Sequence, residues 1–289
     1  MKKPVFTGVC TALVTPFLDS KINYPLAMQL LRRQIDAGVE AVVLAGTTGE
    51  SPTLSDSEKI ELFRRCKDFS GDRCTIIAGT GSNSTQHAVE LSQAAEEAGA
   101  DALLVVSPYY NKANADGLVN HYLCIARSVN IPVIIYNVPS RTGVDIPVSV
   151  YRQLSAIPNI AGVKEASSDL TKQIRTLNAC GGNFCVWAGN DEQIVPSIAI
   201  GGSGVVSVLS NLYPAETVAM IEAALDGDFD TAAALQGDFM ELIDLLFSDI
   251  NPIPVKHAMK YLGYDCGECR LPLSSPNKFL NEKIKNYFI

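Results

Sequence analysis

Short apolar runs alternate with longer stretches of mixed apolar and polar residues over most of the chain. The short runs are apolar at nearly every position, which is typical of parallel strands that helices cover on both faces. We expect strands at residues 8–14, 41–45, 74–78, 102–106, 131–136, 160–164, 184–187 and 205–208.

The stretches between these runs predict helices with recognisable ends. Asn23 is a candidate N-cap and Gly38 a candidate stop for the first helix. Ser55 and Glu58 form a capping-box pattern at the start of the second helix. We expect helices at residues 25–37, 55–71, 84–98, 118–129, 170–179, 194–200 and 214–225, and a short helix after Pro147.

Eight strands that alternate with eight helices over about 225 residues predict an α/β fold, the (β/α)8 TIM barrel. An open doubly wound sheet is the alternative, but no G-x-G-x-x-G pattern follows the first strand. The last part of the chain holds helical stretches at 229–247, 254–262 and 276–287 with no strand between them. We therefore expect a catalytic barrel over 1–225 and a C-terminal helical domain over 226–289.

Composition narrows the class of protein. The chain has 289 residues, 47% of them apolar, and a net charge of −8, so we expect no nucleic-acid partner. The uncharged span 193–215 is long enough to cross a membrane, but glycines and prolines interrupt it, and we expect a helix, a glycine loop and a strand there instead. The first residues lack the apolar core of a signal peptide, which favours the cytoplasm.

The eight cysteines are scattered through apolar segments, as reduced thiols are in a cytoplasmic protein. Cys266 and Cys269 form a lone C-x-x-C pattern with no second pair and no histidine cluster nearby. We therefore expect no metal site there, and interpret both residues as incidental thiols in a loop.

Polar and glycine-rich clusters follow the expected strands almost without exception. They lie at residues 46–50, 79–81, 107–110, 136–143, 164–168, 189–192 and 201–204. In a barrel the carboxyl ends of all strands share one face, and that face holds the active site. The sequence therefore predicts that these clusters meet in space.

Lys164 ends the sixth apolar run, where burying an ammonium is unfavourable. Burial favours the neutral form of a lysine amine, and a neutral amine can form a Schiff base with a carbonyl compound. A pair with Glu165, or an amine that extends to solvent, would explain the position without chemistry. The neighbouring strand ends decide between these interpretations.

Two other strand ends carry three candidate groups. The turn Gly46–Glu50 offers backbone N–H groups and the hydroxyls of Thr47 and Thr48 to a small carboxylate. Tyr136 ends the strand before that of Lys164 and could transfer protons near the amine. Arg141 could bind a carboxylate with two hydrogen bonds. An ordinary turn, a core tyrosine and a surface arginine are the structural alternatives.

The function of two further clusters stays open. Tyr109 and Tyr110 form an aromatic pair that could fill the site or anchor an interface. The glycine-rich loop 201–204 could bind a phosphate, because barrel phosphate sites often lie near the seventh and eighth strands.

Six motifs together resemble the pyruvate-dependent class I aldolase family. They are GTTGES at 46–51, SPYYNK at 107–112, YNVPSRTG at 136–143, VKEASSD at 163–169, AGNDE at 188–192 and GGSGVVSV at 201–208. The resemblance spans nearly the whole chain, and the motifs keep the family's order and spacing. It implies a lyase that condenses pyruvate with L-aspartate-4-semialdehyde in lysine and diaminopimelate biosynthesis, without a metal or cofactor.

The resemblance also implies roles for individual residues. Lys164 matches the Schiff-base lysine and Tyr136 the general acid/base, with Thr47 and Tyr110 as partners in a proton relay. In the family, the tyrosine at position 110 reaches in from a neighbouring subunit of a homotetramer. The substrate-binding positions that match are Thr48 for the pyruvate carboxylate, Arg141 for the semialdehyde carboxylate, and Gly189 and Val206 as pocket residues, where many relatives carry isoleucine in place of Val206.

One departure concerns regulation. Relatives that lysine inhibits bind it at an interface near Ser51, Asn83 and Tyr109, and commonly carry histidine where Lys59 stands and glutamate where His87 stands. We therefore expect weak or absent inhibition by lysine. Two alternative functions stay open at this point. One is a sibling such as an N-acetylneuraminate lyase or sugar-acid aldolase, which the arginine in SRTG argues against, and the other is a non-catalytic barrel scaffold.

Overall fold

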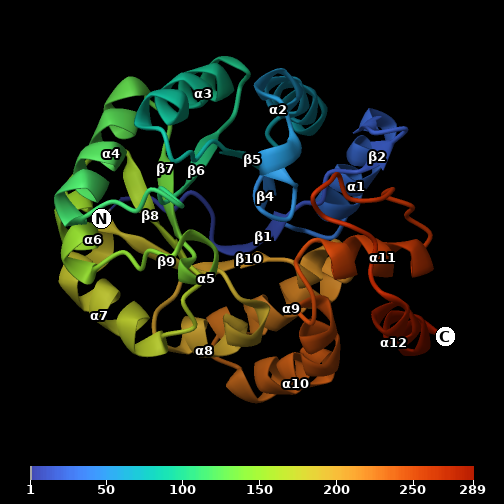
Figure 1. Cartoon of the computed structure of the whole chain (residues 1–289). Helices are drawn as coiled ribbons and strands as arrows, with labels where there is room; N and C mark the ends of the chain where they lie inside the picture. The colour runs from blue at the N-terminus through green and yellow to red at the C-terminus, as the bar shows by residue number, and fades with distance from the viewer. Residues whose placement is uncertain (1) are drawn as a thin grey trace.

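The computed structural model describes residues 2–289, and eight parallel strands form a closed barrel at its centre (Figure 1). Each strand pairs with the next one along the chain, and the first pairs with the last. The barrel strands are β1 (Gly8–Ala12), β4 (Ala41–Leu44), β5 (Thr75–Gly79), β6 (Ala102–Val106), β7 (Val133–Asn137), β8 (Ile160–Glu165), β9 (Cys185–Ala188) and β10 (Gly204–Ser207). Closure confirms the predicted TIM barrel and excludes the open doubly wound sheet.

Helices form a ring outside the strands, as Figure 1 shows. They are α1 (Tyr24–Asp36), α2 (Asp56–Ser70), α3 (Thr85–Glu97), α4 (Ala115–Ser128), α6 (Val148–Leu154), α7 (Leu170–Cys180), α8 (Ile194–Ala199) and α9 (Pro214–Leu225). The elements that were not predicted include the hairpin of β2 (Phe17–Leu18) and β3 (Lys21–Ile22), and the short helix α5 (Pro139–Thr142). Helix α5 matters for function because it carries Arg141.

Side-chain caps define several helix ends. The side chain of Asn23 accepts a hydrogen bond from Leu26 N, and both hydrogen bonds of the Ser55–Glu58 capping box form. Helix α4 begins three residues before the expected start, because the Asn114 side chain caps it by accepting from Gly117 N.

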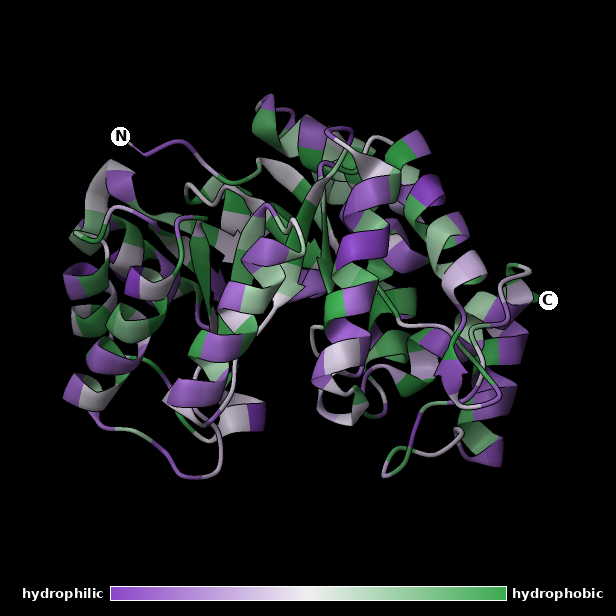
Figure 2. Ribbon diagram, turned by 90° about the horizontal axis from the view of Figure 1, so that it is seen from above, coloured by the Kyte–Doolittle hydropathy of each residue, from purple (hydrophilic) through white to green (hydrophobic). Residues whose placement is uncertain are grey.

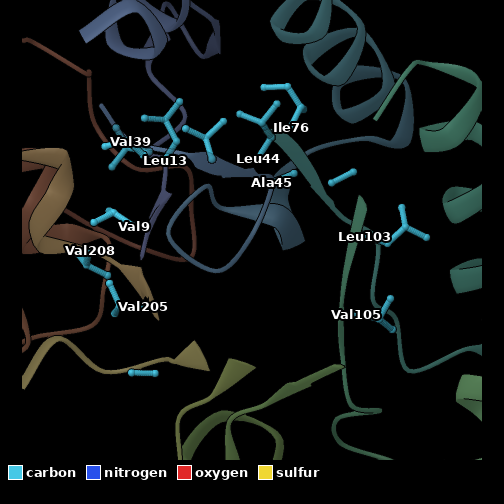
Figure 3. Close-up of a cluster of buried hydrophobic side chains, with 14 of the residues drawn as sticks. Val9, Leu13, Val39, Leu44, Ala45, Ile76, Leu103, Val105, Val205 and Val208 are labelled. Carbon is cyan, nitrogen blue, oxygen red and sulfur yellow. The ribbon is translucent and has the colours of Figure 1, made fainter. Parts of the chain in front are cut away.

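Alternation along the strands divides the hydrophobic core into two parts. Val9, Leu44 and Val105 point outward and pack against the helices (Figure 3), whereas Cys10, Val43 and Leu104 fill the barrel interior. Figure 2 shows mostly apolar strands surrounded by helices in which polar and apolar residues alternate. A polar side chain that points inward at the end of a strand therefore packs against the apolar side chains of the barrel interior.

The last helices, α10 (Phe229–Leu246), α11 (Ile253–Tyr261) and α12 (Lys278–Phe288), lie together on one side of the barrel (Figure 1). Helix α10 packs on α8 and α9. The uncharged span 193–215 forms α8, a glycine loop and β10, as expected, and none of the described helices is long and apolar enough to span a bilayer.

Candidate active site

Lys164 and Tyr136 are direct neighbours at the carboxyl ends of β8 and β7, because the two residues are register partners. Both side chains point into the barrel, and the Lys164 Nζ lies 4.3 Å from the centre of the Tyr136 ring. Each is only 6% exposed. The predicted proximity of amine and phenol is confirmed.

Glu165, the carboxylate next to Lys164 in sequence, does not pair with it. Successive residues of a strand face opposite sides, so Glu165 points out of the barrel towards α6 and α7. There it accepts hydrogen bonds from Asn137 and Tyr151 and lies 3.4 Å from the Lys172 ammonium. Among the described residues, no carboxylate lies within salt-bridge distance of Lys164. The interpretation of Lys164 as half of a structural ion pair is therefore wrong.

A cavity of about 660 Å³ opens beside Tyr136. The Lys164 amine lies next to the Tyr136 ring, but Lys164 is not among the residues that line the cavity. Thr47, Tyr136 and Arg141 line it, as does Asn251 from the segment between α10 and α11. Its outer part extends to Lys59, His87 and Tyr109. The volume and the mixture of apolar walls with a few polar groups are typical of a site for small molecules.

The turn after β4 brings its two threonines to different places. Thr47 lines the cavity, while Thr48 is buried and accepts a hydrogen bond of 3.0 Å from the Asn251 Nδ2. A Cβ on Gly79 would lie 2.2 Å from the Ala45 carbonyl oxygen, so only glycine lets β5 approach this turn so closely. Sequence reasoning missed Asn251, because its place in the site depends on how the C-terminal helices pack.

Glu50 anchors the same turn to the C-terminal segment. It is 2% exposed and accepts hydrogen bonds of 2.8 Å from both the Lys256 Nζ and the Arg270 backbone N–H. The Lys256 ammonium also lies 4.4 Å from the centre of the Phe17 ring. A buried carboxylate with two donors is well compensated, so the turn is held in one conformation.

Arg141 lies on α5 at the rim of the cavity. Its guanidinium donates a hydrogen bond of 3.2 Å to the Asn251 carbonyl oxygen. Within residues 2–289, no carboxylate lies within salt-bridge distance of Arg141. The guanidinium can therefore bind an anionic group that enters the cavity.

The remaining predicted residues lie outside the cavity wall. Tyr110 is 92% exposed and does not line the cavity of its own chain. Gly189 follows β9 and donates its N–H to the Glu165 carbonyl oxygen at 2.7 Å. Val206 is buried inside the barrel with the apolar residues beneath the site.

Burial shifts the pKa of two other groups near the site. Burial raises the pKa of the Asp191 carboxyl, although hydrogen bonds from the Val208 and Leu209 amides oppose that shift. Burial also raises the pKa of the Cys10 thiol, which lies in the barrel interior, far above its ordinary value. Cys10 is therefore a neutral packing residue and not a second nucleophile.

The two cysteines of the C-x-x-C pattern are also neutral thiols with raised pKa values. Burial raises the pKa of the Cys266 and Cys269 thiols to about 12. Cys266 is buried with its Sγ 3.8 Å from the Met259 Sδ. Neither thiol has the thiolate character that reactive or metal-binding cysteines need.

An α/β barrel with an unpaired lysine beside a tyrosine at its carboxyl face defines a barrel lyase. The sequence model of the dihydrodipicolinate synthetase family matches residues 5–287. The chain belongs to this family.

Individual relatives agree over nearly the full length. A 4-hydroxy-tetrahydrodipicolinate synthase of Acetivibrio thermocellus is 42% identical, over 99% of each chain. The structure of a dihydrodipicolinate synthase from Aquifex aeolicus is 39% identical and matches with a TM-score of 0.96, over 98% of this chain and 97% of that one. A synthase from Cyanidioschyzon merolae with lysine bound is 38% identical and has a TM-score of 0.95, over 98% of this chain and 97% of that one.

Proposed function

We propose that the cavity beside Lys164 is the active site at which this chain condenses pyruvate with L-aspartate-4-semialdehyde. The product is 4-hydroxy-tetrahydrodipicolinate, an intermediate of lysine and diaminopimelate biosynthesis. The observation that carries the assignment of the site is the Lys164 amine, which lies 4.3 Å from the Tyr136 ring and makes no ion pair with any described carboxylate.

The reaction begins at the pyruvate carbonyl. The Lys164 amine adds to C2 of pyruvate, and the resulting carbinolamine loses water to give an iminium. Tyr136 supplies the proton that leaves with the hydroxyl, because its side chain borders both the amine and the cavity. Loss of a proton from the methyl carbon gives an enamine, which forms a C–C bond to the aldehyde carbon of the second substrate. The amino group of the adduct then displaces Lys164 as the ring closes.

The two carboxylates bind to separate groups of the site. The turn of Thr47 and Thr48 holds the carboxylate of pyruvate through hydroxyl and backbone donors, and Arg141 receives the carboxylate of the semialdehyde at the rim. Gly189 and Val206 support the pocket near the lysine from outside the cavity wall.

We infer that Tyr110 acts in the site of a neighbouring subunit, where it extends the proton relay of Thr47 and Tyr136. Its 92% exposure in the isolated chain supports this assignment, since a large aromatic side chain on the surface is suited to an interface. The assembly that we propose is a homotetramer. All eight cysteines are free thiols, which supports a cytoplasmic location.

We also propose the division into a barrel over 1–225 and a helical domain over 226–289. The boundary falls in the turn after α9, where the strand–helix alternation ends. The second part still contributes to the site, because Asn251 lines the cavity and Lys256 holds the turn after β4.

Reductive trapping tests the assignment. The enzyme is incubated with pyruvate and borohydride, and the intact mass and a peptide map are recorded. We expect one pyruvate-derived adduct on Lys164, none in Lys164→Ala, and turnover in an assay with pyruvate and the semialdehyde, with the N-acetylneuraminate reaction as a negative control. An adduct on another lysine, or an active Lys164→Ala enzyme, would overturn the proposal.

A further inference from the structure

A second pair of side chains lies directly behind the Lys164–Tyr136 pair. Asn137 follows Tyr136 and Glu165 follows Lys164, and these two residues are also register partners on β7 and β8. Their side chains face away from the cavity and meet across the strands, where the Asn137 Nδ2 donates to the Glu165 Oε1 at 2.7 Å. Both residues are at most 1% exposed.

Glu165 is bonded on both of its carboxylate oxygens. The Oε1 also accepts from the Ser167 backbone N–H at 3.0 Å, and the Oε2 accepts from the Tyr151 hydroxyl at 3.1 Å. The Lys172 ammonium lies 3.4 Å from the Oε2. Since Tyr151 belongs to α6 and Lys172 to α7, this one carboxylate joins two strands to two helices.

Asn137 extends the network to the loop that carries Arg141. Its Oδ1 accepts from the Ile146 backbone N–H at 3.0 Å, and its Nδ2 donates to the Asp145 Oδ1 at 2.8 Å. Asp145 is also bonded to Lys172. The strand end of Tyr136 and the far end of the Arg141 loop are therefore fixed to the same buried group.

Stability alone does not explain a charged network at this place. Buried ion pairs are often no more stabilising than well-packed apolar side chains, because desolvation offsets the attraction between the charges. Directional hydrogen bonds do, however, fix the register and height of the strand ends. A misplacement of about 1 Å in a reacting group can reduce a rate by about 100-fold.

We propose that Glu165 is a positioning residue: through Asn137 it holds the Tyr136 phenol, the Lys164 amine and the Arg141 loop in their reactive arrangement. This inference rests on the proposed function of Lys164. Glu165 touches neither substrate, so its effect must appear in rates more than in the binding of pyruvate, whose carboxylate is held by the turn after β4 on another part of the barrel.

Glu165→Gln tests the proposal while conserving side-chain shape. The new amide keeps an acceptor for Asn137 and Ser167 but turns an N–H donor towards the Lys172 ammonium, which can only donate, and it removes the acceptor of the Tyr151 hydroxyl. Val150→Ala is the matched control, because Val150 is a fully buried core residue of α6 that makes no hydrogen bond to Glu165 through its side chain. We measure kcat, the KM for pyruvate, the rate of borohydride trapping and the unfolding midpoint of each variant.

We expect Glu165→Gln to lower kcat and the trapping rate by roughly 10- to 100-fold, with the KM for pyruvate within about twofold of the wild type. Val150→Ala should lose stability but keep both rates. Tyr151→Phe removes only the hydroxyl and should lower the trapping rate by about threefold, so it decides the outcome if Glu165→Gln does not fold.

The possible results separate the two proposals. If the wild-type enzyme forms no adduct on Lys164, the proposed function fails. If it forms the adduct but Glu165→Gln, or Tyr151→Phe in its place, traps pyruvate as fast as Val150→Ala, Glu165 is not a positioning residue. A Glu165→Gln enzyme with a raised KM for pyruvate and an unchanged kcat would also overturn the inference.

Discussion

The Asn251 side-chain amide donates a hydrogen bond to the Thr48 hydroxyl, and the Asn251 backbone carbonyl oxygen accepts one from the Arg141 guanidinium. One residue of the C-terminal part therefore contacts the residues proposed to bind the carboxylates of both substrates. Asn251 is 7% exposed, so these contacts lie within the protein and are largely shielded from competing water.

Asn251→Ala should weaken pyruvate binding. Loss of a hydrogen bond of about 1 kcal/mol to the Thr48 hydroxyl corresponds to roughly a fivefold rise in the KM for pyruvate. Steady-state kinetics with varied pyruvate measure the change. Asn281→Ala is the control, since Asn281 contacts His257 on α11 and not the cavity. An unchanged KM in Asn251→Ala would mean that Thr48 needs no help from the C-terminal segment.

Tyr136→Phe should leave the fold intact and lower kcat by about 100- to 10,000-fold, because the ring remains in the barrel interior while the proton donor is lost. The adduct with pyruvate should form more slowly but still on Lys164. Stopped-flow or quenched trapping follows its formation. A rate close to that of the wild type would show that another group transfers the proton.

Arg141→Ala should impair the second substrate far more than the first. Charged hydrogen bonds contribute about 1.5–3 kcal/mol, so the KM for the semialdehyde should rise by roughly 10- to 100-fold while the pyruvate adduct still forms. Arg73→Ala is a suitable control, because the Arg73 side chain donates only to backbone carbonyls in the last turn of α2. Equal losses in both steps would contradict the assigned role.

Lysine should inhibit the enzyme weakly or not at all. At the outer cavity, Asp56 already pairs with His87 at 2.8 Å and lies 3.7 Å from the Lys59 ammonium. A bound lysine would place a second ammonium beside Lys59, which weakens binding by about tenfold or more. Half-maximal inhibition by submillimolar lysine in a steady-state assay would refute this prediction. The double variant Lys59→His with His87→Glu should gain sensitivity.

Stability should fall in weak acid because of His121. Burial lowers the pKa of His121 from 6.5 to about 4, and its Nδ1 hydrogen-bonds the Thr85 hydroxyl. Between pH 6.5 and pH 4 the unfolded chain binds a proton that the folded chain excludes, so the free energy of unfolding decreases as the pH falls, by up to about 3 kcal/mol. Urea titrations across this range should show a flatter decrease for His121→Asn, which keeps a polar group near Thr85. Equal slopes would contradict the assignment.

Much of the fold could be predicted because local signals agreed with one another. The alternating apolar runs, the Asn23 cap and the Ser55–Glu58 capping box each report on a few neighbouring residues, and all are present. Helix boundaries were less predictable, since the start of α4 depends on whether Asn114 turns its side chain onto the Gly117 amide.

The site was predictable where strand ends alone determine it. Tyr136 and Lys164 each end one of two neighbouring parallel strands, so the order of the strands alone indicates that the two residues lie close together. Asn251 could not be found this way, because no periodic pattern relates it to the barrel. The only local signal was its place before Pro252, in a turn between two helices.

The pair of Glu50 and Lys256 has a consequence for how the protein is made. Synthesis proceeds from the N-terminus, so the carboxylate of Glu50 leaves the ribosome 206 residues before the ammonium that it needs. Until Lys256 and Arg270 emerge, the turn that holds Thr47 and Thr48 has no partner for its buried charge. Nascent chains that end before this point contain all eight barrel strands but lack the groups that complete the binding site.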